Sequence, residues 1–249
     1  MVEPILSVRS LNKRFAGLIA TNDLDLDVMP NETHALIGPN GAGKTTLIAQ
    51  LQGELNPDGG RISFNGRDIT RSPPHRRSQL GIARSFQITS VFPQFTVLAN
   101  VALAVQARLG HGFRFWRDTS SDPALTGPAR EALDTIGLTH RAAVVVEDLS
   151  HGERRQLELA MALAMKPSLL LLDEPMAGMG RQDGQRMTRI LSEIKKHYAI
   201  LIVEHDMDAV FALADRISVL VAGAVIATGA PDEIRSDARV KAAYLGHRT

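Results

Sequence analysis

The chain has 249 residues, 44% of them hydrophobic and 22% charged, so it can bury a full core. Its formal net charge of +1 excludes bulk electrostatic attraction to nucleic acid or to an anionic membrane surface as its main mode of binding. The absence of cysteine excludes disulfides and thiolate metal sites. The N-terminus lacks the basic and apolar segments of a signal peptide, so we expect a cytoplasmic location.

The N-terminal part carries the signals of antiparallel strands. Residues 5–9 and 24–28 alternate apolar and polar side chains, and Asn65-Gly66 within 61–67 predicts a hairpin turn. The pair Pro73-Pro74, together with the basic residues Arg71, His75, Arg76 and Arg77, predicts a solvated surface connection.

The middle of the chain, residues 91–165, is predicted to form a helical insert, because apolar residues recur at helical spacing over 97–109 and 129–138. Between these helices, residues 111–118 combine basic and aromatic side chains, which can stack on nucleic-acid bases. We favour a loop that docks on a protein or packs its own aromatics, and expect no nucleic-acid partner.

Two apolar runs in the last third, 168–175 and 198–205, end in polar residues. This is typical of parallel strands buried on both faces, with functional groups at their carboxyl ends. Residues 217–230 predict two short strands that turn near Gly223, and this stretch is too short to be a membrane-spanning helix. The core is therefore predicted to be of the α/β class.

The stretch GPNGAGKTT follows the apolar run 33–37 and fits the pattern G-x-x-x-x-G-K-[ST]. In this P-loop, backbone N–H groups surround phosphates at the start of a helix. Lys44 can reach the β- and γ-phosphates, and the Thr45 hydroxyl can bind Mg²⁺. The predicted nucleotide-binding residues are Gly38, Pro39, Asn40, Gly41, Ala42, Gly43, Lys44, Thr45 and Thr46.

Asp173 and Glu174 end the apolar run 168–175. An aspartate at a strand end can hold Mg²⁺ through its water shell, and the adjacent carboxylate can act as a base toward an attacking water. After a P-loop, this pair predicts hydrolysis of the nucleotide. Shortly before it, Ser150 and Gly152 lie where a helix should begin, and offer a hydroxyl and free N–H groups to an anion.

These motifs resemble, over essentially the whole chain, those of the nucleotide-binding subunits of ABC transporters. Five motifs occur in the family's order: the P-loop, a Q-loop at Phe86-Gln87, a signature at 149–153, the strand ending at Asp173-Glu174, and a switch-histidine loop at 204–206. Phe15 falls where the family has an aromatic residue that stacks on adenine. The resemblance implies a P-loop NTPase core with a mainly parallel sheet, an antiparallel β subdomain and a helical insert subdomain. We expect one ABC ATPase domain over 1–249, with the core and β subdomain in 1–90 and 166–249 and the insert in 91–165.

The resemblance also implies that two such subunits share each ATP, so that Ser150 and Gly152 serve the partner's nucleotide. Gln87 would bind Mg²⁺ and water together with Thr45 and Asp173, Glu174 would polarise the water, and His205 would contact the γ-phosphate. The expected cofactors are ATP and Mg²⁺.

ATP closes the dimer and hydrolysis releases it, and the movement would pass to two transmembrane permease subunits. We expect permease contacts at Val91, Phe92 and Phe95, just after the Q-loop. The chain would then lie peripherally on the cytoplasmic face of the bacterial inner membrane.

Several departures from the family pattern narrow the subfamily. His151 replaces the usual second signature glycine, and Glu153 replaces a glutamine. Residues 176–180, the D-loop, lack the usual aspartate. The missing aspartate puts in question the contact that the D-loop usually makes across the dimer. With the long insert and the ending at 243–246, this resembles the ATPase of branched-chain amino-acid importers, which also use a periplasmic solute-binding protein and two different ATPases. Three alternatives are a urea or amide importer, a soluble ABC ATPase acting in DNA repair or on ribosomes, and a P-loop kinase. The soluble ATPases usually have a second cassette or a long coiled coil, and a kinase has no reason to carry the signature.

Overall fold

The computed structural model describes residues 2–85, 91–109 and 122–245. Its strands are β1 (Leu6–Phe15), β2 (Leu18–Val28), β3 (Thr33–Ile37), β4 (Gly59–Phe64), β5 (Arg67–Asp68), β6 (Ile82–Ser85), β7 (Leu169–Asp173), β8 (Ala199–Val203), β9 (Arg216–Val221) and β10 (Ala224–Gly229). Its α-helices are α1 (Lys44–Gln52), α2 (Pro74–Leu80), α3 (Val97–Arg108), α4 (Pro123–Thr135), α5 (His151–Ala164), α6 (Arg181–Ile194), α7 (Met207–Leu213), α8 (Pro231–Ser236) and α9 (Ala238–Leu245).

The strands form two sheets. One is antiparallel, in the order β2-β1-β4-β5, as the alternating N-terminal segments predict. The other has the order β10-β9-β3-β8-β7-β6, in which β9, β3, β8, β7 and β6 are parallel and β10 pairs antiparallel with β9. The predicted α/β class with a mainly parallel sheet is confirmed.

Both faces of the parallel sheet are covered, which explains the uninterrupted apolar runs. In β7, Leu169 and Leu171 pack into the cluster shared with α1 and the antiparallel sheet, whereas Leu170 and Leu172 pack into the cluster shared with the helices of the opposite face. All four leucines are fully buried. A strand with two buried faces needs no polar alternation, and polar groups enter only where the strand ends, at Asp173.

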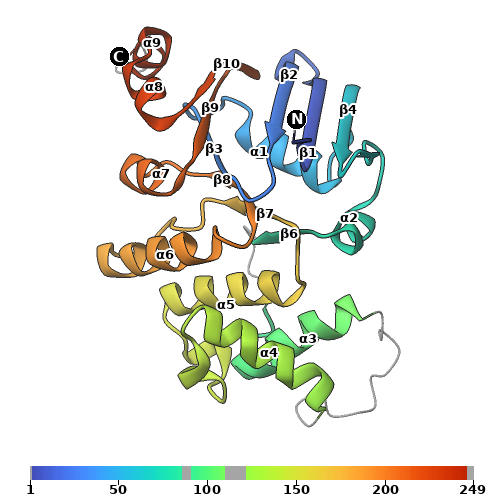
Figure 1. Ribbon diagram of the computed structural model, residues 1–249, viewed down its shortest axis with the longest axis vertical. Helices are drawn as coiled ribbons and strands as arrows, with labels where there is room; N and C mark the ends of the chain where they lie inside the picture. The colour runs from blue at the N-terminus through green and yellow to red at the C-terminus, as the bar shows by residue number, and fades with distance from the viewer. Residues whose placement is uncertain (1, 86–90, 110–121, 246–249) are drawn as a thin grey trace.

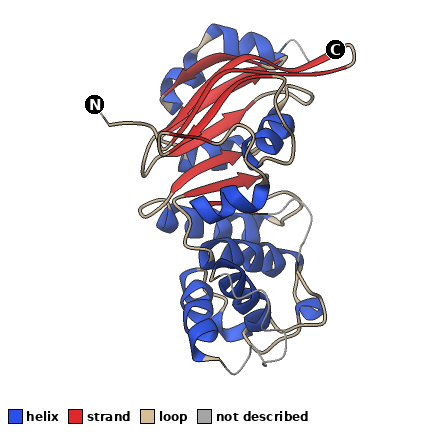
Figure 2. Cartoon of the chain, turned by 90° about the vertical axis from the view of Figure 1, so that its right-hand side faces the viewer, coloured by secondary structure: helices blue, strands red, loops and turns tan. Residues whose placement is uncertain are grey.

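The helices α3, α4 and α5 pack against one another at one end of the molecule, away from the antiparallel sheet (Figures 1 and 2). The helix expected at 97–109 is confirmed as α3, which begins at the cap formed by Thr96 Oγ1 and the N–H of Ala99. The helix expected at 129–138 instead spans Pro123–Thr135. It begins early because the Asp122 side chain caps its N-terminus and Pro123 occupies its first turn, and it continues through Gly127-Pro128.

The expectation of a solvated connection around 71–77 is wrong for Arg77. This residue lies on α2, is 1% exposed, and its guanidinium donates to the carbonyl oxygens of Gln50, Leu51, Thr70 and Ser72 at 2.8–3.0 Å. Gln50 and Leu51 belong to the last turn of α1, whose carbonyls have no partner within the helix. Arg77 therefore caps the carboxyl end of the helix that follows the P-loop. Arg71, His75 and Arg76 are exposed, as expected.

The first two strands are longer than expected. Alternation identifies only 5–9 and 24–28 because the strands are irregular. The register between β1 and β2 shifts after Val8. In addition, Ser10 and Asp23 have positive φ values of 48° and 46°. Such irregularities break the two-residue period while the strands continue. The hairpin formed by β1 and β2 consequently extends to Phe15 and Leu18, beyond Asn12, where the pairing of β1 with β4 ends.

Candidate functional site

The P-loop connects the end of β3 to the start of α1. Gly43 stands at the N-cap with φ 105°, and a Cβ atom on it would lie 2.1 Å from the backbone oxygen of Ala20. A glycine is therefore required there, both for the left-handed conformation and for the close passage of β2. The loop is fixed further by the Gly223 N–H, which donates to the Ala42 oxygen at 2.8 Å, so the β9–β10 turn also holds the P-loop.

Lys44 is buried at the base of this loop. Its ammonium donates to the carbonyl oxygens of Gly38 at 2.7 Å and Pro39 at 3.0 Å. Burial lowers the pKa of Lys44, and the carboxylates of Glu174 and Asp173 oppose that shift. The ammonium is thus close to both strand-end carboxylates. Thr45, the next residue of α1, is exposed, so its hydroxyl is available to a ligand.

Asp173 has the properties of a cation ligand. The residue is 3% exposed, and neither carboxylate oxygen accepts a hydrogen bond within the described part of the chain. Burial raises the pKa of Asp173, with the opposing charges of Arg84 and Lys44 close by. Two buried oxygens without donors fit a hard cation such as Mg²⁺, which prefers oxygen ligands and keeps several waters.

Glu174 and His205 are brought together from the ends of β7 and β8. The Nε2 atom of His205 lies 2.7 Å from Oε1 of Glu174, and both side chains are partly exposed. Since a carboxylate only accepts, this bond places a proton on Nε2. Glu174 has φ 50°, and its N–H donates to Val203 O at 2.8 Å, so its backbone is held in an uncommon conformation beside the neighbouring strand.

The segment 149–153 forms the start of α5. Ser150 Oγ accepts from the Glu153 N–H at 3.2 Å, and Glu153 Oε2 accepts from the Ser150 N–H at 2.9 Å, a reciprocal capping box. Arg141 pairs with Glu153 at 2.8 Å. The glutamate in place of the usual glutamine therefore caps its own helix. In the described residues, no hydrogen bond or ion pair joins this segment to the P-loop of the same chain.

His151 contacts the D-loop. Its Nε2 lies 3.2 Å from the Ala177 carbonyl oxygen, and a Cβ on Gly178 would approach the same ring to 3.2 Å. Met176 in this loop is 8% exposed and packs in the core, so the methionine at that position serves packing. Gly152 is buried against Asp183 of α6. The signature and the D-loop thus touch within one chain.

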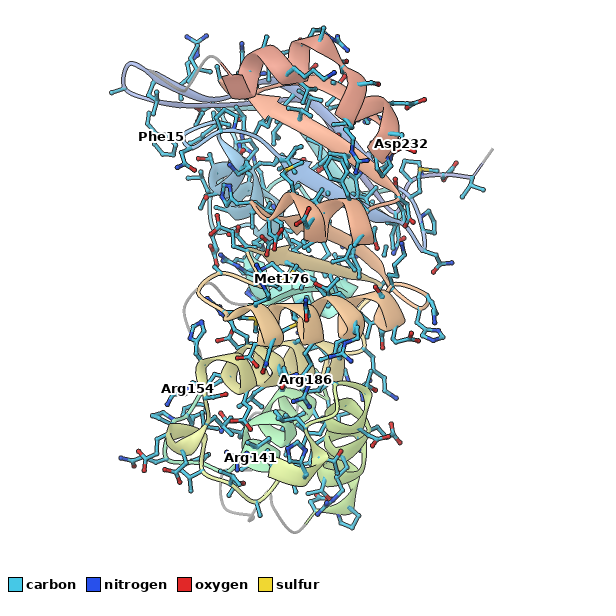
Figure 3. All side chains as sticks on the ribbon, turned by 90° about the vertical axis from the view of Figure 1, so that its left-hand side faces the viewer. Phe15, Arg141, Arg154, Met176, Arg186 and Asp232 are labelled. Carbon is cyan, nitrogen blue, oxygen red and sulfur yellow. The ribbon has the colours of Figure 1, made fainter. Side chains whose placement is uncertain are left out.

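Phe15 lies at the tip of the β1–β2 hairpin and is 46% exposed, with the Lys13 ammonium 5.5 Å from its ring centre. Figure 3 shows Phe15 at the strand-rich end and Arg141 and Arg154 at the helical end. The hairpin tip and the helix that carries the signature therefore lie in different parts of the molecule. Because β2 passes against Gly43 at Ala20, the hairpin tip lies near the P-loop.

Gln87, together with Phe86 and residues 88–90, lies outside the described residues. After this gap, Phe92 and Phe95 are 53% and 47% exposed and stack at 5.3 Å, whereas Val91 packs partly against the core. Phe92 lines a mostly apolar groove of about 420 Å³ between the sheet end and the helical end. Its other walls come from α2, β6, α3 and α5, including Leu103, Ala107 and Met161, which sequence reasoning did not select.

A second cavity, of about 1060 Å³, opens beside Glu174 and His205 and is lined by the D-loop and by residues of α6 and α7. Sequence reasoning assigned no role to Glu204, although it directly follows β8 and precedes His205. This residue is 4% exposed, and its carboxylate accepts from the N–H groups of Met176 at 3.0 Å and His205 at 2.9 Å. Glu204 therefore joins the D-loop to the histidine loop.

Arg84 on β6 was also missed. Its guanidinium lies 3.7 Å from Asp173 Oδ2 and hydrogen-bonds to Glu54 and Gln52. A lone arginine in a short strand gives no signal for such contacts, because its acceptors are distant in the sequence.

Comparisons with known proteins identify the family of this chain. A family described as ABC transporter matches residues 21–177, and one described as branched-chain amino acid ATP-binding cassette transporter matches residues 224–248. The chain is 36% identical to the high-affinity branched-chain amino acid transport ATP-binding protein LivG of Escherichia coli, and 34% identical to BraF of Pseudomonas aeruginosa, over 99% of each chain.

Among solved structures, the ADP conformation of an ATP-binding cassette of an ABC transporter superposes with a TM-score of 0.87 at 28% identity, covering 98% of this chain and 99% of the other. Across the described ranges, no helix is both long and apolar enough to cross a bilayer. A match over more than half of the sequence, and relatives that align over nearly all of it, confirm the resemblance on which the motif assignments rest. The chain belongs to the ABC transporter family.

Proposed function

We propose that this chain is the ATP-hydrolysing subunit of an importer for branched-chain amino acids. The observation that carries the hydrolytic part is the 2.7 Å contact between Glu174 and His205, beside the buried carboxylate of Asp173. The solute is proposed from the likeness to LivG and BraF and from the C-terminal match at 224–248. Nothing in this chain has to contact the amino acid, since the permeases and a periplasmic solute-binding protein would do so.

The P-loop would hold the phosphates of ATP through its backbone N–H groups. Lys44 would exchange the carbonyl oxygens of Gly38 and Pro39 for phosphate oxygens, because an ammonium gains more from an anion than from neutral carbonyls. Phe15 would stack on the adenine. Thr45, Asp173 and Gln87 would hold Mg²⁺, which when bound supplies charge neutralisation across the phosphates.

Glu174 is positioned to act as the base. Its Oε1 is engaged by His205, so Oε2 is left to accept a proton from an attacking water. His205 would then contact both Glu174 and the γ-phosphate, and so connect the base to the phosphate that is cleaved. The contact would let the γ-phosphate control the geometry of the base, because His205 would be released when the γ-phosphate leaves.

A second ATP-binding subunit would complete the site. Ser150, exposed at the start of α5, makes no hydrogen bond to its own P-loop within the described residues and is available to the nucleotide of a partner. The backbone of Gly152, which is buried against Asp183 within the single chain, would join it there. The cavity of about 1060 Å³ beside Glu174 faces the D-loop and would receive that partner. The apolar groove at Phe92 would receive a permease segment, on the cytoplasmic face of the inner membrane.

The test is ATP hydrolysis by the purified chain and its Glu174→Gln variant. We expect the variant to bind ATP within about twofold of the parent chain, and to lose roughly 10²- to 10⁴-fold in turnover, the usual contribution of a general base. Glu193→Gln makes the same chemical change on the exposed face of α6 and should hydrolyse normally. Unchanged turnover in Glu174→Gln would reject Glu174 as the base.

A further inference from the structure

Arg84 lies between two acidic side chains of different surroundings. It belongs to β6, next to β7, and its side chain is 15% exposed. On one side, its Nη2 lies 3.7 Å from Oδ2 of Asp173, whose side chain is 1% exposed. On the other side, its Nη1 donates to both oxygens of Glu54, at 3.0 and 3.1 Å, and Glu54 is half exposed.

The contact with Asp173 is an ion pair without a hydrogen bond. A separation of 3.7 Å exceeds the range of an N–H···O bond, and both oxygens of Asp173 lack donors in the described residues. Among the described residues, Arg84 is nevertheless the nearest permanent positive charge to this buried carboxylate, and it opposes the rise that burial causes in the pKa of Asp173. Among the described residues, Arg84 is therefore the main protein counter-charge of Asp173.

The contact with Glu54 is made at the groove. Gln52 ends α1, the helix that follows the P-loop, and Glu54 comes directly after the turn that ends it. Gln52, Glu54 and Arg84 all line the apolar groove that also contains Phe92. One guanidinium thus touches both the groove wall and the metal carboxylate.

We propose that Arg84 is a positioning residue that divides its charge between Asp173 and Glu54, and so couples metal binding to occupancy of the groove. When a divalent cation is bound at Asp173, like-charge repulsion moves the guanidinium toward Glu54. When the permease segment proposed for this groove engages Glu54, the guanidinium moves toward Asp173, and the cation is held less tightly. Coupling between two sites is reciprocal, so both effects follow from the one side chain. This inference rests on the proposed function, because it takes Asp173 as the metal carboxylate.

The test measures the binding of Mn²⁺ to the purified full chain in the presence of saturating ADP. Free Mn²⁺ is followed by its electron paramagnetic resonance signal, and the Mn²⁺ bound by ADP in the absence of protein is subtracted. Arg84→Met removes the competing charge and should tighten Mn²⁺ binding by roughly three- to tenfold, the scale of one partly screened charge. Glu54→Gln removes the competing carboxylate charge while the hydrogen bond from Arg84 to Gln52 remains, so more of the guanidinium charge acts on Asp173 and Mn²⁺ binding should weaken by a similar factor. A residue that only supports the fold would make both variants change in the same direction.

Arg76→Met and Glu193→Gln are matched controls at exposed positions, and both should bind Mn²⁺ as the parent chain does. Two variants that both weaken binding, or that both leave it unchanged, would overturn the inference. If Arg84→Met does not fold, Glu54→Gln decides alone, since that side chain is half exposed. A parent chain that binds Mn²⁺ without opposite shifts in the variants contradicts only the role of Arg84. A parent chain that binds no Mn²⁺ with ADP contradicts the proposed function as well.

Discussion

Replacing Arg77 by methionine should destabilise the whole fold, because its guanidinium caps the carboxyl end of α1 from inside the core. The side chain donates four hydrogen bonds to backbone carbonyl oxygens, and in the described residues no carboxylate pairs with it. Burial lowers the pKa of Arg77 to about 10, so the group remains charged at neutral pH. The carbonyls replace the water that this cation loses.

The cost can be worked out from the acceptors. The Gln50 oxygen keeps a second donor, the Gly53 N–H at 3.1 Å, whereas the oxygens of Leu51, Thr70 and Ser72 lose the guanidinium. At about 1–1.5 kcal/mol for each unsatisfied carbonyl, the loss is roughly 3–5 kcal/mol. Removing an unpaired buried cation recovers part of this, so we expect about 3 kcal/mol, or roughly 10 °C in Tm for a domain of this size.

Thermal unfolding followed by circular dichroism measures this change. Arg76→Met is the matched control, since Arg76 is the preceding residue, is exposed, and should change the free energy of unfolding by no more than about 0.5 kcal/mol. Arg77→Lys should recover little, because one ammonium cannot reach four carbonyls that lie around a planar fork. Equal melting temperatures for Arg77→Met and Arg76→Met would refute the capping role.

Two further predictions concern a buried histidine and the P-loop. Burial, aided by the charge of Arg216, lowers the pKa of His34 to about 3 in the folded chain, whereas in the unfolded chain the imidazole binds a proton near pH 6.5. The neutral His34 therefore contributes fully to the free energy of unfolding above pH 6.5, and this contribution declines as the pH falls toward 3. Lowering the pH from 7 to 5 should therefore reduce the free energy of unfolding by about 2 kcal/mol through His34, as measured by urea unfolding. This reduction should be smaller in His34→Gln and unchanged in His197→Gln. The same pH dependence in the parent chain and both variants would contradict this. Gly43→Ala should lower ATP affinity far more than Gly41→Ala, measured by equilibrium dialysis, because a Cβ at 43 would meet Ala20 O at 2.1 Å while one at 41 would meet nothing within 4 Å. An equal loss of ATP affinity in the two variants would contradict this, because backbone strain alone, without the contact with Ala20, would then explain both.

The parts of the site that the sequence predicts are those in which residues adjacent in the chain act together. The P-loop is one continuous stretch between β3 and α1, and Asp173 and Glu174 end a strand whose two buried faces produce an unmistakable apolar run. The 2.7 Å contact between Glu174 and His205 was not predicted, because the family resemblance implied only that both residues serve the same nucleotide. Adjacent parallel strands bring their carboxyl ends together, but periodicity cannot tell which strands are adjacent.

The parts that sequence reasoning missed depend on contacts between distant segments. Arg77 and Arg76 are both arginines in the same basic run, yet one is 1% exposed and the other lies in solvent. The difference is which of them faces the end of α1, about 25 residues earlier in the chain, and no local pattern encodes that direction. Arg84 is the same case, since its partners come from α1 and β7.

The most direct test of the transport assignment is to trap the tagged Glu174→Gln chain with ATP in its native membranes, solubilise it gently, and identify the copurifying proteins by mass spectrometry. We expect two distinct permeases and a second ATP-binding subunit, and the solute-binding protein encoded with them should bind leucine, isoleucine or valine in preference to urea. Recovery of the chain with ribosomes or DNA, and without permeases, would contradict the transport function while leaving the ATP site intact.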